Sequence, residues 1–463
     1  MIQKLSKHNL LLVGFTLFSM FFGAGNLIFP PFLGAEAGSL TWQAMGGFLI
    51  SAVGLPVMGV AAVARSGGLT NLASRVHPWF AALFTLLIYL SIGPCLAIPR
   101  TASTSFEMTV LPILSGLKVN MGIVAGRTGF TVETVSRFAY SALFFAVAMA
   151  IAFRPEKLTD RLGKVLCPTL LVLIGVIFTG CLVWPMGPYG APSQAYSSGP
   201  AVKGFLEGYQ TMDTIAALNF GIVIALNIRA KGVDQEGAVV RETIKAGVIA
   251  GILLGLIYGA LAHIGAPAGA VGSGMDNGAR ILTYVAGSLF GKAGMMILGL
   301  IFLIACFNTC VGLLSCCSQY FTTLLPLIGY KVWVAVFAII SLVISSAGLN
   351  RILAISMPVL NAVYPVAIVL IVLAFLNPLT KRWPAMFPWS ILLAGIVSVV
   401  YALEQIDVVI PFLSRAAALL PGYEAGLGWI VPALAGMAAG MAASSLMGIA
   451  GPYSVTKKRT DER

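Results

Sequence analysis

Long apolar runs dominate this sequence and limit the folds that are open to it. In the hydrocarbon core of a bilayer every backbone polar group needs a partner within the protein, so a spanning segment is either a helix or a strand of a closed barrel. Runs of about 20 apolar residues are typical of helices, and we therefore predict an all-α polytopic membrane protein with about 12 transmembrane helices. The predicted spans are Leu10–Leu33, Thr41–Ala64, Trp79–Ile98, Ser136–Phe153, Val165–Trp184, Val202–Ile228, Thr243–Ala266, Gly294–Tyr320, Val332–Leu349, Ile352–Leu376, Phe387–Leu403 and Leu427–Met447.

The composition argues against a water-soluble protein of this length. Of the 463 residues, 59% are hydrophobic and 10% are charged, and the mean hydropathy is +0.95. So few charged residues cannot cover a soluble fold of this size. The net charge of +12 comes from Lys and Arg residues dispersed in short loops, which is typical of topology signals and not of a nucleic-acid surface. We therefore predict no nucleic-acid partner. The seven cysteines show no spacing suited to a structural metal, and we predict no resident cofactor.

The charge of the loops predicts how the chain crosses the membrane. Cytoplasmic loops of membrane proteins carry an excess of Lys and Arg. The basic loops Arg154–Lys164 and Arg229–Lys245 then face the cytoplasm, and the uncharged loop Pro185–Pro200 faces outward. We predict one multi-pass transmembrane domain over residues 1–463, surrounded by lipid, with both termini in the cytoplasm and no required protein subunit. The segment Ile406–Leu420 is short and contains charged residues, so we assign it to an outer loop or a re-entrant piece.

The first predicted span contains residues that interrupt a helix. Two glycines, Asn26 and paired prolines lie within Phe22–Pro31. Such residues free backbone groups at membrane depth, where N–H groups at the start of a half-helix suit a carboxylate and carbonyls at the end of the preceding one suit a cation. The alternative is a close contact between two helices, which glycines in membrane helices often provide. Asn26 and the prolines favour a break.

The sixth predicted span carries a carboxyl group near its middle. Asp213 follows the polar stretch Glu207–Met212 within Val202–Ile228. A charged group at this depth is costly and indicates a functional site, with a substrate ammonium group, a cation or a proton as its partner. The alternative is a structural role, in which Asp213 pairs with Lys203 or Arg100 or lies at the membrane interface.

The two interrupted spans predict an internal repeat. Each of them begins a group of five spans, which places a first repeat at residues 10–184 and a second at residues 202–376. Because five is odd, the second group is inverted in the membrane relative to the first. Paired interruptions of this kind indicate the binding site of an inverted-repeat transporter. Two additional helices follow at residues 387–447.

Three sequence motifs resemble those of the bacterial branched-chain amino acid:cation symporters. The first is Phe21–Pro31, the second comprises Ile92–Pro94, Ile98–Thr101 and Ser105–Glu107, and the third is Gly208–Asp213. The resemblance covers nearly the whole chain. It implies a five-plus-five inverted-repeat amino acid transporter fold, with broken helices 1 and 6, in the bacterial cytoplasmic (inner) membrane. It also implies that the chain is not an enzyme and imports leucine, isoleucine and valine with a cation, most simply Na⁺, by alternating access.

The resemblance further implies a transport site between the first, third, sixth and eighth spans. Backbone amides of the first break would face the substrate carboxylate, and side-chain oxygens of both breaks would lie near the substrate and sodium. The substrate-binding candidates are Gly23, Ala24, Gly25, Asn26, Tyr89, Gly93, Tyr209, Gln210 and Asp213. The sodium candidates are Ser19, Phe22, Asn26, Thr211, Asp213, Ala305, Asn308 and Thr309.

Two of these assignments leave alternatives open. In Ala305–Thr309 the resemblance implies two adjacent hydroxyl residues for a second sodium ion, but Asn308 replaces one of them; the alternative is an ordinary interhelical hydrogen bond from Thr309. Arg100 would lie outward of the site, either as an outer gate that pairs with Glu107 or Glu207 or as an arginine that extends to the interface.

Other functions fit the sequence less well. A membrane enzyme is disfavoured because the sequence has no HExxH motif and no acidic cluster for a metal. A channel would need a repeated filter or rings of charge. The main alternative is a proton-coupled transporter of another small neutral amino acid, with Asp213 as the proton acceptor. The neutral oxygens of Asn26, Thr211, Asn308 and Thr309 favour sodium.

Overall fold

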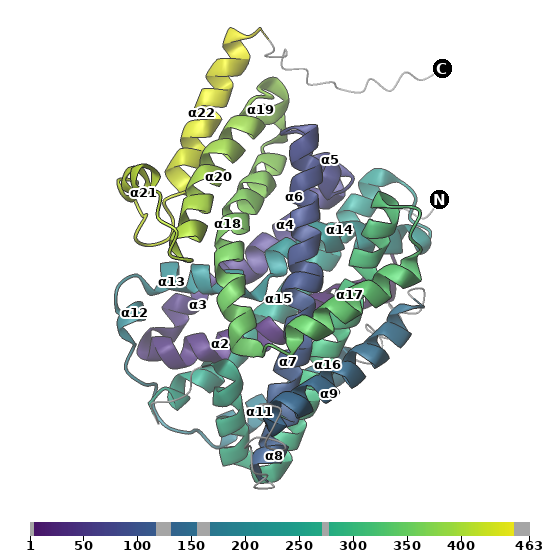
Figure 1. Ribbon diagram of the computed structural model, residues 1–463, viewed down its shortest axis with the longest axis vertical. Coiled ribbons are helices and arrows are strands. Elements are labelled where there is room, and N and C mark those ends of the chain that lie inside the picture. The colour runs from purple at the N-terminus through teal and green to yellow at the C-terminus, as the bar shows by residue number, and fades with distance from the viewer. Residues whose placement is uncertain (1–3, 117–130, 155–166, 271–276, 449–463) are drawn as a thin grey trace. The chain divides into compact units, whose positions relative to one another are not determined.

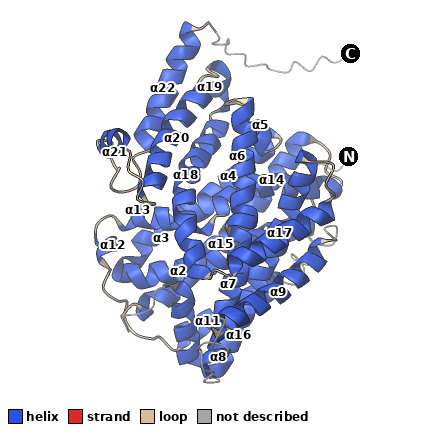
Figure 2. Cartoon of the chain, viewed as in Figure 1, coloured by secondary structure: helices blue, strands red, loops and turns tan. Residues whose placement is uncertain are grey.

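The computed structural model describes residues 4–116, 131–154, 167–270 and 277–448, which form helices joined by loops (Figure 1). Figure 2 shows no strand in these ranges. The first half contains α1 (Lys7–Phe21), α2 (Ala24–Ala37), η1 (Gly38–Leu40), α3 (Thr41–Leu49), η2 (Ile50–Gly54), α4 (Leu55–Ser66), α5 (Leu69–Ala73), α6 (Pro78–Leu90), η3 (Ser91–Cys95), α7 (Ala97–Thr109), α8 (Leu111–Gly116), α9 (Val132–Ala152) and α11 (Cys167–Val183). The second half contains α12 (Gln194–Ser197), α13 (Pro200–Glu207), η6 (Gly208–Thr211), α14 (Asp213–Ala230), α15 (Glu236–Ala268), α16 (Gly278–Leu324), α17 (Tyr330–Ser345), α18 (Leu349–Phe375), α19 (Asn377–Arg382), α20 (Met386–Glu404), α21 (Pro411–Ala418) and α22 (Ile430–Leu446).

Each predicted span coincides with helical structure where the chain is described. Eight helical stretches are long and apolar enough to cross a membrane, and three shorter apolar helices accompany them among the described residues. The prediction of an all-α membrane fold is therefore confirmed. The segment Ile406–Leu420 contains the short helix α21. Both chain ends and residues 155–166, which include most of the predicted inner loop Arg154–Lys164, lie outside the described ranges.

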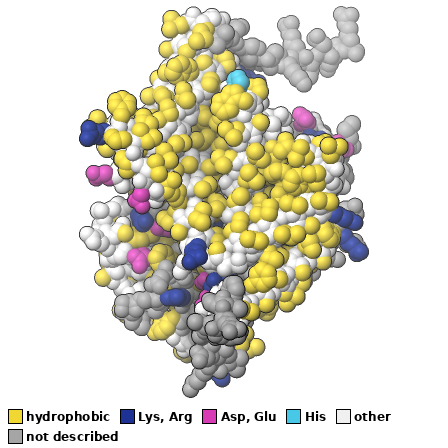
Figure 3. Space-filling model, in the orientation of Figure 1, with side chains coloured by type: hydrophobic (Ala, Val, Ile, Leu, Met, Phe, Trp, Pro, Cys, Tyr) yellow, Lys and Arg dark blue, Asp and Glu magenta, His cyan; other side chains and the backbone are white. Residues whose placement is uncertain are grey.

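Large apolar side chains cover much of the surface. Figure 3 shows hydrophobic side chains over most of the visible face, with Lys, Arg, Asp and Glu confined to a few places. Leu143 of α9, Leu256 of α15 and Val343 of α17 are among the exposed apolar side chains. A continuous exposed apolar surface is costly in water but is the expected outside of a protein surrounded by lipid.

The chain divides into two compact units. The first comprises the described residues of Met1–Gly68 and Leu86–Leu360, and the second those of Leu69–Thr85 and Asn361–Arg463. In the second unit α20 packs against α22. In the first unit α15 packs against α2, and backbones meet directly there, because a Cβ atom at Gly265 would overlap the carbonyl group of Pro31. Small residues allow such contacts between membrane helices.

Helices in the first unit are interrupted where the sequence predicts breaks. The first predicted span divides into α1 and α2, and the sixth into α13, η6 and α14. The third span changes course at Gly93, whose backbone is non-helical inside η3. The helix α16 bends at Gly291, where φ is +57°, a value that glycine adopts without strain. The interruptions in the first, third and sixth spans lie at buried residues, whereas Gly291 is exposed.

Candidate functional site

The first helix break lies between α1 and α2. Phe22 is extended, and Gly23 is the N-cap of α2. The N–H group of Gly23 donates to Oδ1 of Asn26 (3.0 Å), so the asparagine side chain closes the first turn of α2. Of the three amides predicted to face a substrate carboxylate, that of Gly23 thus has a partner within the chain. Ala24 and Gly25, together with Gly23, line a cavity between the helices.

The second helix break lies between η6 and α14. Met212 has a left-handed backbone with φ +65°, which is uncommon for a residue with a side chain and indicates a constrained site. Asp213 follows as the first residue of α14 and is 2% exposed. The first turn of a helix stabilises negative charge, because its N–H groups point outward from the helix end. The break therefore presents a carboxyl group in the interior of the first unit.

Asp213 connects the two breaks through hydrogen bonds. Its Oδ2 atom accepts from Nδ2 of Asn26 (2.6 Å) and from the hydroxyl group of Tyr258 in α15 (2.8 Å). The Asn26 amide and the Tyr258 hydroxyl also contact each other. A buried carboxyl group requires donors of this kind, because its desolvation is otherwise uncompensated. Lys203, one of the structural partners predicted for Asp213, forms an ion pair with Glu207 instead (3.1 Å).

A small cavity of about 30 Å³ lies between the two breaks. Its lining contains polar residues from the two breaks, α7 and α16, together with apolar residues. The lining residues at the two breaks and the polar ones from α7 and α16 are Gly23, Ala24, Gly25, Asn26, Arg100, Thr101, Thr211, Met212, Asp213 and Thr309. The other lining residues are apolar: Met20, Phe21, Ile92, Ala97, Ala216, Phe220 and Leu313. A space of this size holds about one or two water molecules, so a ligand as large as an amino acid enters only after the helices separate.

The helix α7 brings Arg100 to the same cavity. Nη1 of Arg100 donates to the carbonyl group of Gln210 (2.8 Å), and Nη2 lies 3.5 Å from the carbonyl oxygen of Thr211. The guanidinium group also lies over the ring of Phe29, 5.8 Å from the ring centre. Arg100 is 3% exposed, which contradicts the alternative of an arginine that extends to the interface. Glu207, one of the predicted gate partners, forms its ion pair with a lysine.

A group of oxygen atoms lies beside the first break, where α16 meets α1. Oγ1 of Thr309 donates to the carbonyl group of Phe22 (3.2 Å), and Nδ2 of Asn308 donates to Oγ of Ser19 (3.1 Å). Oδ1 of Asn308 is buried and accepts no hydrogen bond from the described residues. A buried oxygen without a donor is costly, and neutral oxygens at an unwound helix suit an alkali cation. Ala305 is buried one turn earlier on α16.

The close approach of α16 to the break depends on Gly23. A Cβ atom at Gly23 would lie 2.6 Å from Oγ1 of Thr309, closer than real side chains come. The glycine therefore lets the Thr309 hydroxyl reach the backbone of α1. The described residues contain no group of three or more His, Cys, Asp or Glu side chains that could hold a metal ion, so the oxygen group differs from a zinc-type centre.

Four predicted substrate residues do not line the cavity in the described structure. Tyr89 stacks on Tyr320, with the ring centres 3.8 Å apart. The ring of Tyr209 packs in the buried interior, and Gln210 offers its backbone carbonyl to the arginine of α7. Gly93 lies against Cys317, where a Cβ atom would be 3.1 Å from the sulfur. The structure therefore does not place these four predicted residues at the cavity.

Tyr258 is a site residue that the sequence analysis missed. It lies within the predicted span Thr243–Ala266, and a tyrosine hydroxyl at that depth needs a hydrogen-bond partner, which is the signal that could have identified it. By contrast, the predicted residue Thr211 does line the cavity. Its hydroxyl donates to the carbonyl group of Gly208 (2.9 Å) and lies 3.4 Å from the Asp213 amide nitrogen.

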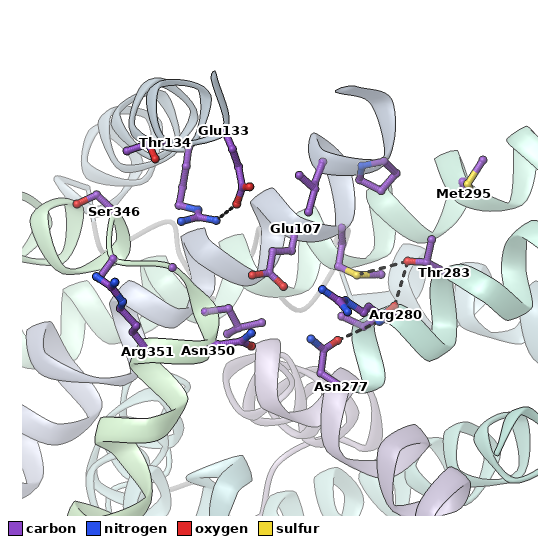
Figure 4. A pocket seen from close by; sticks show the side chains of 18 of the residues that line it. Glu107, Glu133, Thr134, Asn277, Arg280, Thr283, Met295, Ser346, Asn350 and Arg351 are labelled. Carbon is purple, nitrogen blue, oxygen red and sulfur yellow. Dashed lines mark hydrogen bonds and ion pairs between the residues drawn. The ribbon is translucent and has the colours of Figure 1, made fainter. Parts of the chain in front are cut away.

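A wider cavity of about 920 Å³ lies at the other end of α7 (Figure 4). Glu107 of α7 and Arg280 of α16 point into it, and Glu133 and Arg137 form an ion pair on α9 at its wall. Side chains of both charges therefore line this space. Arg100 lies seven residues before Glu107, about 10 Å along the helix axis. The helix α7 thus extends from one cavity to the other.

Comparison with known proteins identifies the same family as the motifs. The family described as "Branched-chain amino acid transport protein" matches residues 6–447. The branched-chain amino acid permease BraB of Bacillus subtilis (strain 168) is 39% identical over 455 residues, which cover 96% of this chain and 98% of that protein. The branched-chain amino acid permease BrnQ of Escherichia coli (strain K12) is 35% identical over 442 residues, which cover 93% and 94% of the two chains.

Solved structures share the fold at low sequence identity. The crystal structure of MhsT in complex with L-phenylalanine has a TM-score of 0.58 and 16% identity, and the match covers 95% of this chain and 100% of that one. The inward-facing conformation of Mhp1 has a TM-score of 0.57 and 15% identity, with 95% and 92% covered. These likenesses confirm the fold of the inverted-repeat transporters with broken helices. The relatives are permeases and not enzymes, and the chain belongs to the family of branched-chain amino acid transport proteins.

Proposed function

We propose that this protein imports leucine, isoleucine and valine together with Na⁺ by alternating access. It acts as a single transmembrane domain in the bacterial inner membrane, with both termini in the cytoplasm and without a required subunit. The names of the related permeases support the substrate class. The observation that carries the cation is the buried Oδ1 atom of Asn308, which has no donor among the described residues and lies in the oxygen group beside the first break.

The mixed polar and apolar lining of the central cavity supports an amino acid as substrate. The carboxyl group of Asp213 suits the substrate ammonium group, and the N–H groups of Ala24 and Gly25 at the start of α2 suit its carboxylate. Ile92, Phe220 and the other apolar lining residues suit a branched aliphatic chain. Burial of such a side chain contributes about 1.5–3 kcal/mol, enough to favour leucine over alanine.

The oxygen group beside the first break supports a coupling ion. The carbonyl group of Phe22 and the side chains of Ser19, Asn308 and Thr309 supply neutral oxygens. Asn26 and Thr211, at the two breaks, supply further oxygens near the substrate position. A cation held here organises both breaks before the amino acid binds, so ion and substrate stabilise each other's binding.

The sizes of the two cavities support a conformational step. The central cavity of about 30 Å³ cannot hold leucine, so the helices around it separate when the substrate enters. The wider cavity at the far end of α7 offers an approach lined by both charges, which suits a zwitterion. Alternate opening of the central site to the two faces of the membrane then moves both solutes.

Radiolabelled leucine uptake into proteoliposomes, with sodium and proton gradients imposed separately, tests the proposal. An inward sodium gradient should drive accumulation of leucine, and excess isoleucine or valine should compete while lysine and glutamate should not. Accumulation driven by a proton gradient in the absence of sodium would instead favour the second candidate. In that mechanism Asp213, whose hydrogen-bond partners Asn26 and Tyr258 are both neutral, carries the proton.

A further inference from the structure

Two side chains of opposite charge line the central cavity. Among the described residues that surround it, Asp213 of α14 supplies the acid and Arg100 of α7 supplies the base. Arg100 is 3% exposed and Asp213 is 2% exposed. A guanidinium group is costly to bury unless its environment compensates for the lost water. Its presence at a cavity, away from the surface, therefore requires an explanation beyond helix packing.

The compensation comes from the end of a half-helix. Nη1 of Arg100 donates to the carbonyl group of Gln210 (2.8 Å), whereas Nη2 lies at the longer distance of 3.5 Å from the carbonyl oxygen of Thr211. These carbonyls end η6, and the C-terminal end of a helix carries partial negative charge. The contact at 3.5 Å is a weak hydrogen bond. Of these two contacts, the one made by Nη1 is the shorter.

The Nη2 atom of Arg100 also lies close to the first break. A Cβ atom at Gly25 would lie 2.6 Å from Nη2 of Arg100, so the guanidinium group lies directly against the first turn of α2. Ala24 and Gly25, the first two residues of α2, line the cavity at the same turn. The guanidinium group and the first turn of α2 therefore border one region of the cavity, in which an anion would be stabilised by both.

We propose that Arg100 binds the α-carboxylate of the transported amino acid, while Asp213 binds its ammonium group. This inference rests on the proposed function and assigns the group that selects for an α-amino acid. A zwitterion places one charge against each of the two buried charges, whereas an amine or a carboxamide satisfies only Asp213. Arginine presents planar donors that match a carboxylate, and such charge-assisted hydrogen bonds are strong in a site without water. The same guanidinium group contacts the carbonyls that end η6. Binding of the carboxylate to Arg100 would therefore also change these contacts at the second break.

Competition by carboxylate analogues tests the inference in the full-length protein. Inhibition of radiolabelled leucine uptake is measured with leucine and with leucinamide, which keeps the ammonium group and the side chain but lacks the carboxylate. The parent protein should prefer leucine by at least about 10- to 100-fold, the range expected for one hydrogen bond between charged groups. In Arg100→Gln the affinity for leucine should fall by a similar factor, and the affinity for leucinamide should change little. The ratio of leucine affinity to leucinamide affinity in this variant should therefore approach one.

Two further variants complete the design. Arg100→Lys keeps the charge but loses the planar donors, so its ratio of leucine to leucinamide affinity should lie between those of the parent and Arg100→Gln. If Arg100→Gln does not insert into the membrane, Arg100→Lys is compared with the parent in its place. Arg415→Gln, which removes an exposed arginine of α21, should behave like the parent. Ligand-induced thermal stabilisation of the purified variants by leucine and leucinamide provides the same ratio when uptake is too slow to measure.

Several results would overturn the inference. If the parent protein bound leucinamide as tightly as leucine, no residue would recognise the carboxylate and the inference would fail. Equal losses of leucine and leucinamide affinity in Arg100→Gln and Arg100→Lys would show that Arg100 only positions η6. These results are distinct from a failure of the proposed function, in which leucine uptake would not depend on sodium while the preference over leucinamide, measured by thermal stabilisation, would persist.

Discussion

Substitution of Thr309 by alanine tests the proposed cation site directly. The hydroxyl group donates to the Phe22 carbonyl (3.2 Å) and approaches Gly23 closely, so the variant removes one oxygen from the group without disturbing Asn308. A hydrogen bond or ligand contact to a charged group contributes about 1.5–3 kcal/mol. Each 1.4 kcal/mol is about a tenfold change in affinity. We therefore expect the sodium concentration for half-maximal leucine uptake to rise by about 10- to 100-fold.

The linkage between ion and substrate sharpens this test. The two sites share the first break, and a coupling free energy of about 1–3 kcal/mol is typical of such sites. The Thr309→Ala variant should therefore bind leucine weakly at low sodium and recover much of its affinity at saturating sodium. The assay is leucine uptake into proteoliposomes over a grid of sodium and leucine concentrations. Thr309→Ser, which restores the hydroxyl group, should lie close to the parent.

A control on the same helix separates a local effect from general destabilisation. The hydroxyl group of Thr323 is exposed and donates to the Tyr320 carbonyl within its own helix (2.6 Å), so Thr323→Ala should leave the sodium titration unchanged. A sodium titration of Thr309→Ala that overlays the parent's would refute a cation contact at Thr309. A leucine defect that saturating sodium does not relieve would show that the hydroxyl serves the substrate or the packing of α16 instead.

Further predictions concern the hydrogen bonds, the packing and the topology. Asp213→Asn should insert and fold but lose coupled leucine uptake, because it removes the charged partner of the ammonium group or cation; normal uptake in reconstituted vesicles would make the carboxylate structural. Tyr258→Phe, which deletes the donor 2.8 Å from that carboxylate, should weaken leucine affinity by about tenfold, measured by competition at saturating sodium, and an unchanged affinity would count against the hydrogen bond. Gly265→Leu should lower the free energy of unfolding by about 1–3 kcal/mol or more and so lower the melting temperature of the purified protein, because a side chain there overlaps the backbone of α2. A melting curve like that of the parent would contradict this packing. Cysteines at Ser193 and Lys381 should lie on opposite faces of the membrane, so an impermeant thiol reagent added to whole cells should label only Ser193→Cys, and equal labelling would contradict the predicted topology.

The sequence by itself determined the fold class and the positions of the helix breaks. Long apolar runs permit few structures in a bilayer, because backbone groups without partners are too costly there. The breaks follow from local chemistry as well. Glycines and an asparagine end α1 at Phe22–Gly23, and a polar stretch before Asp213 ends η6. The position of Asp213 near the middle of its span was sufficient to predict a buried carboxyl group, which is 2% exposed.

The partners of these residues were decided only by the tertiary structure. Asp213 and Tyr258 are 45 positions apart, and Arg100 and Gln210 are 110 apart, so no local pattern relates them. Which side chains meet depends on the rotation of each helix about its axis and on how closely the backbones approach. Tyr89, predicted at the substrate, turns instead onto Tyr320. Arg100, predicted near the outer face, lies at the cavity because α7 begins beyond the irregular turn at Gly93 and the carbonyls that end η6 offset the desolvation of its charge.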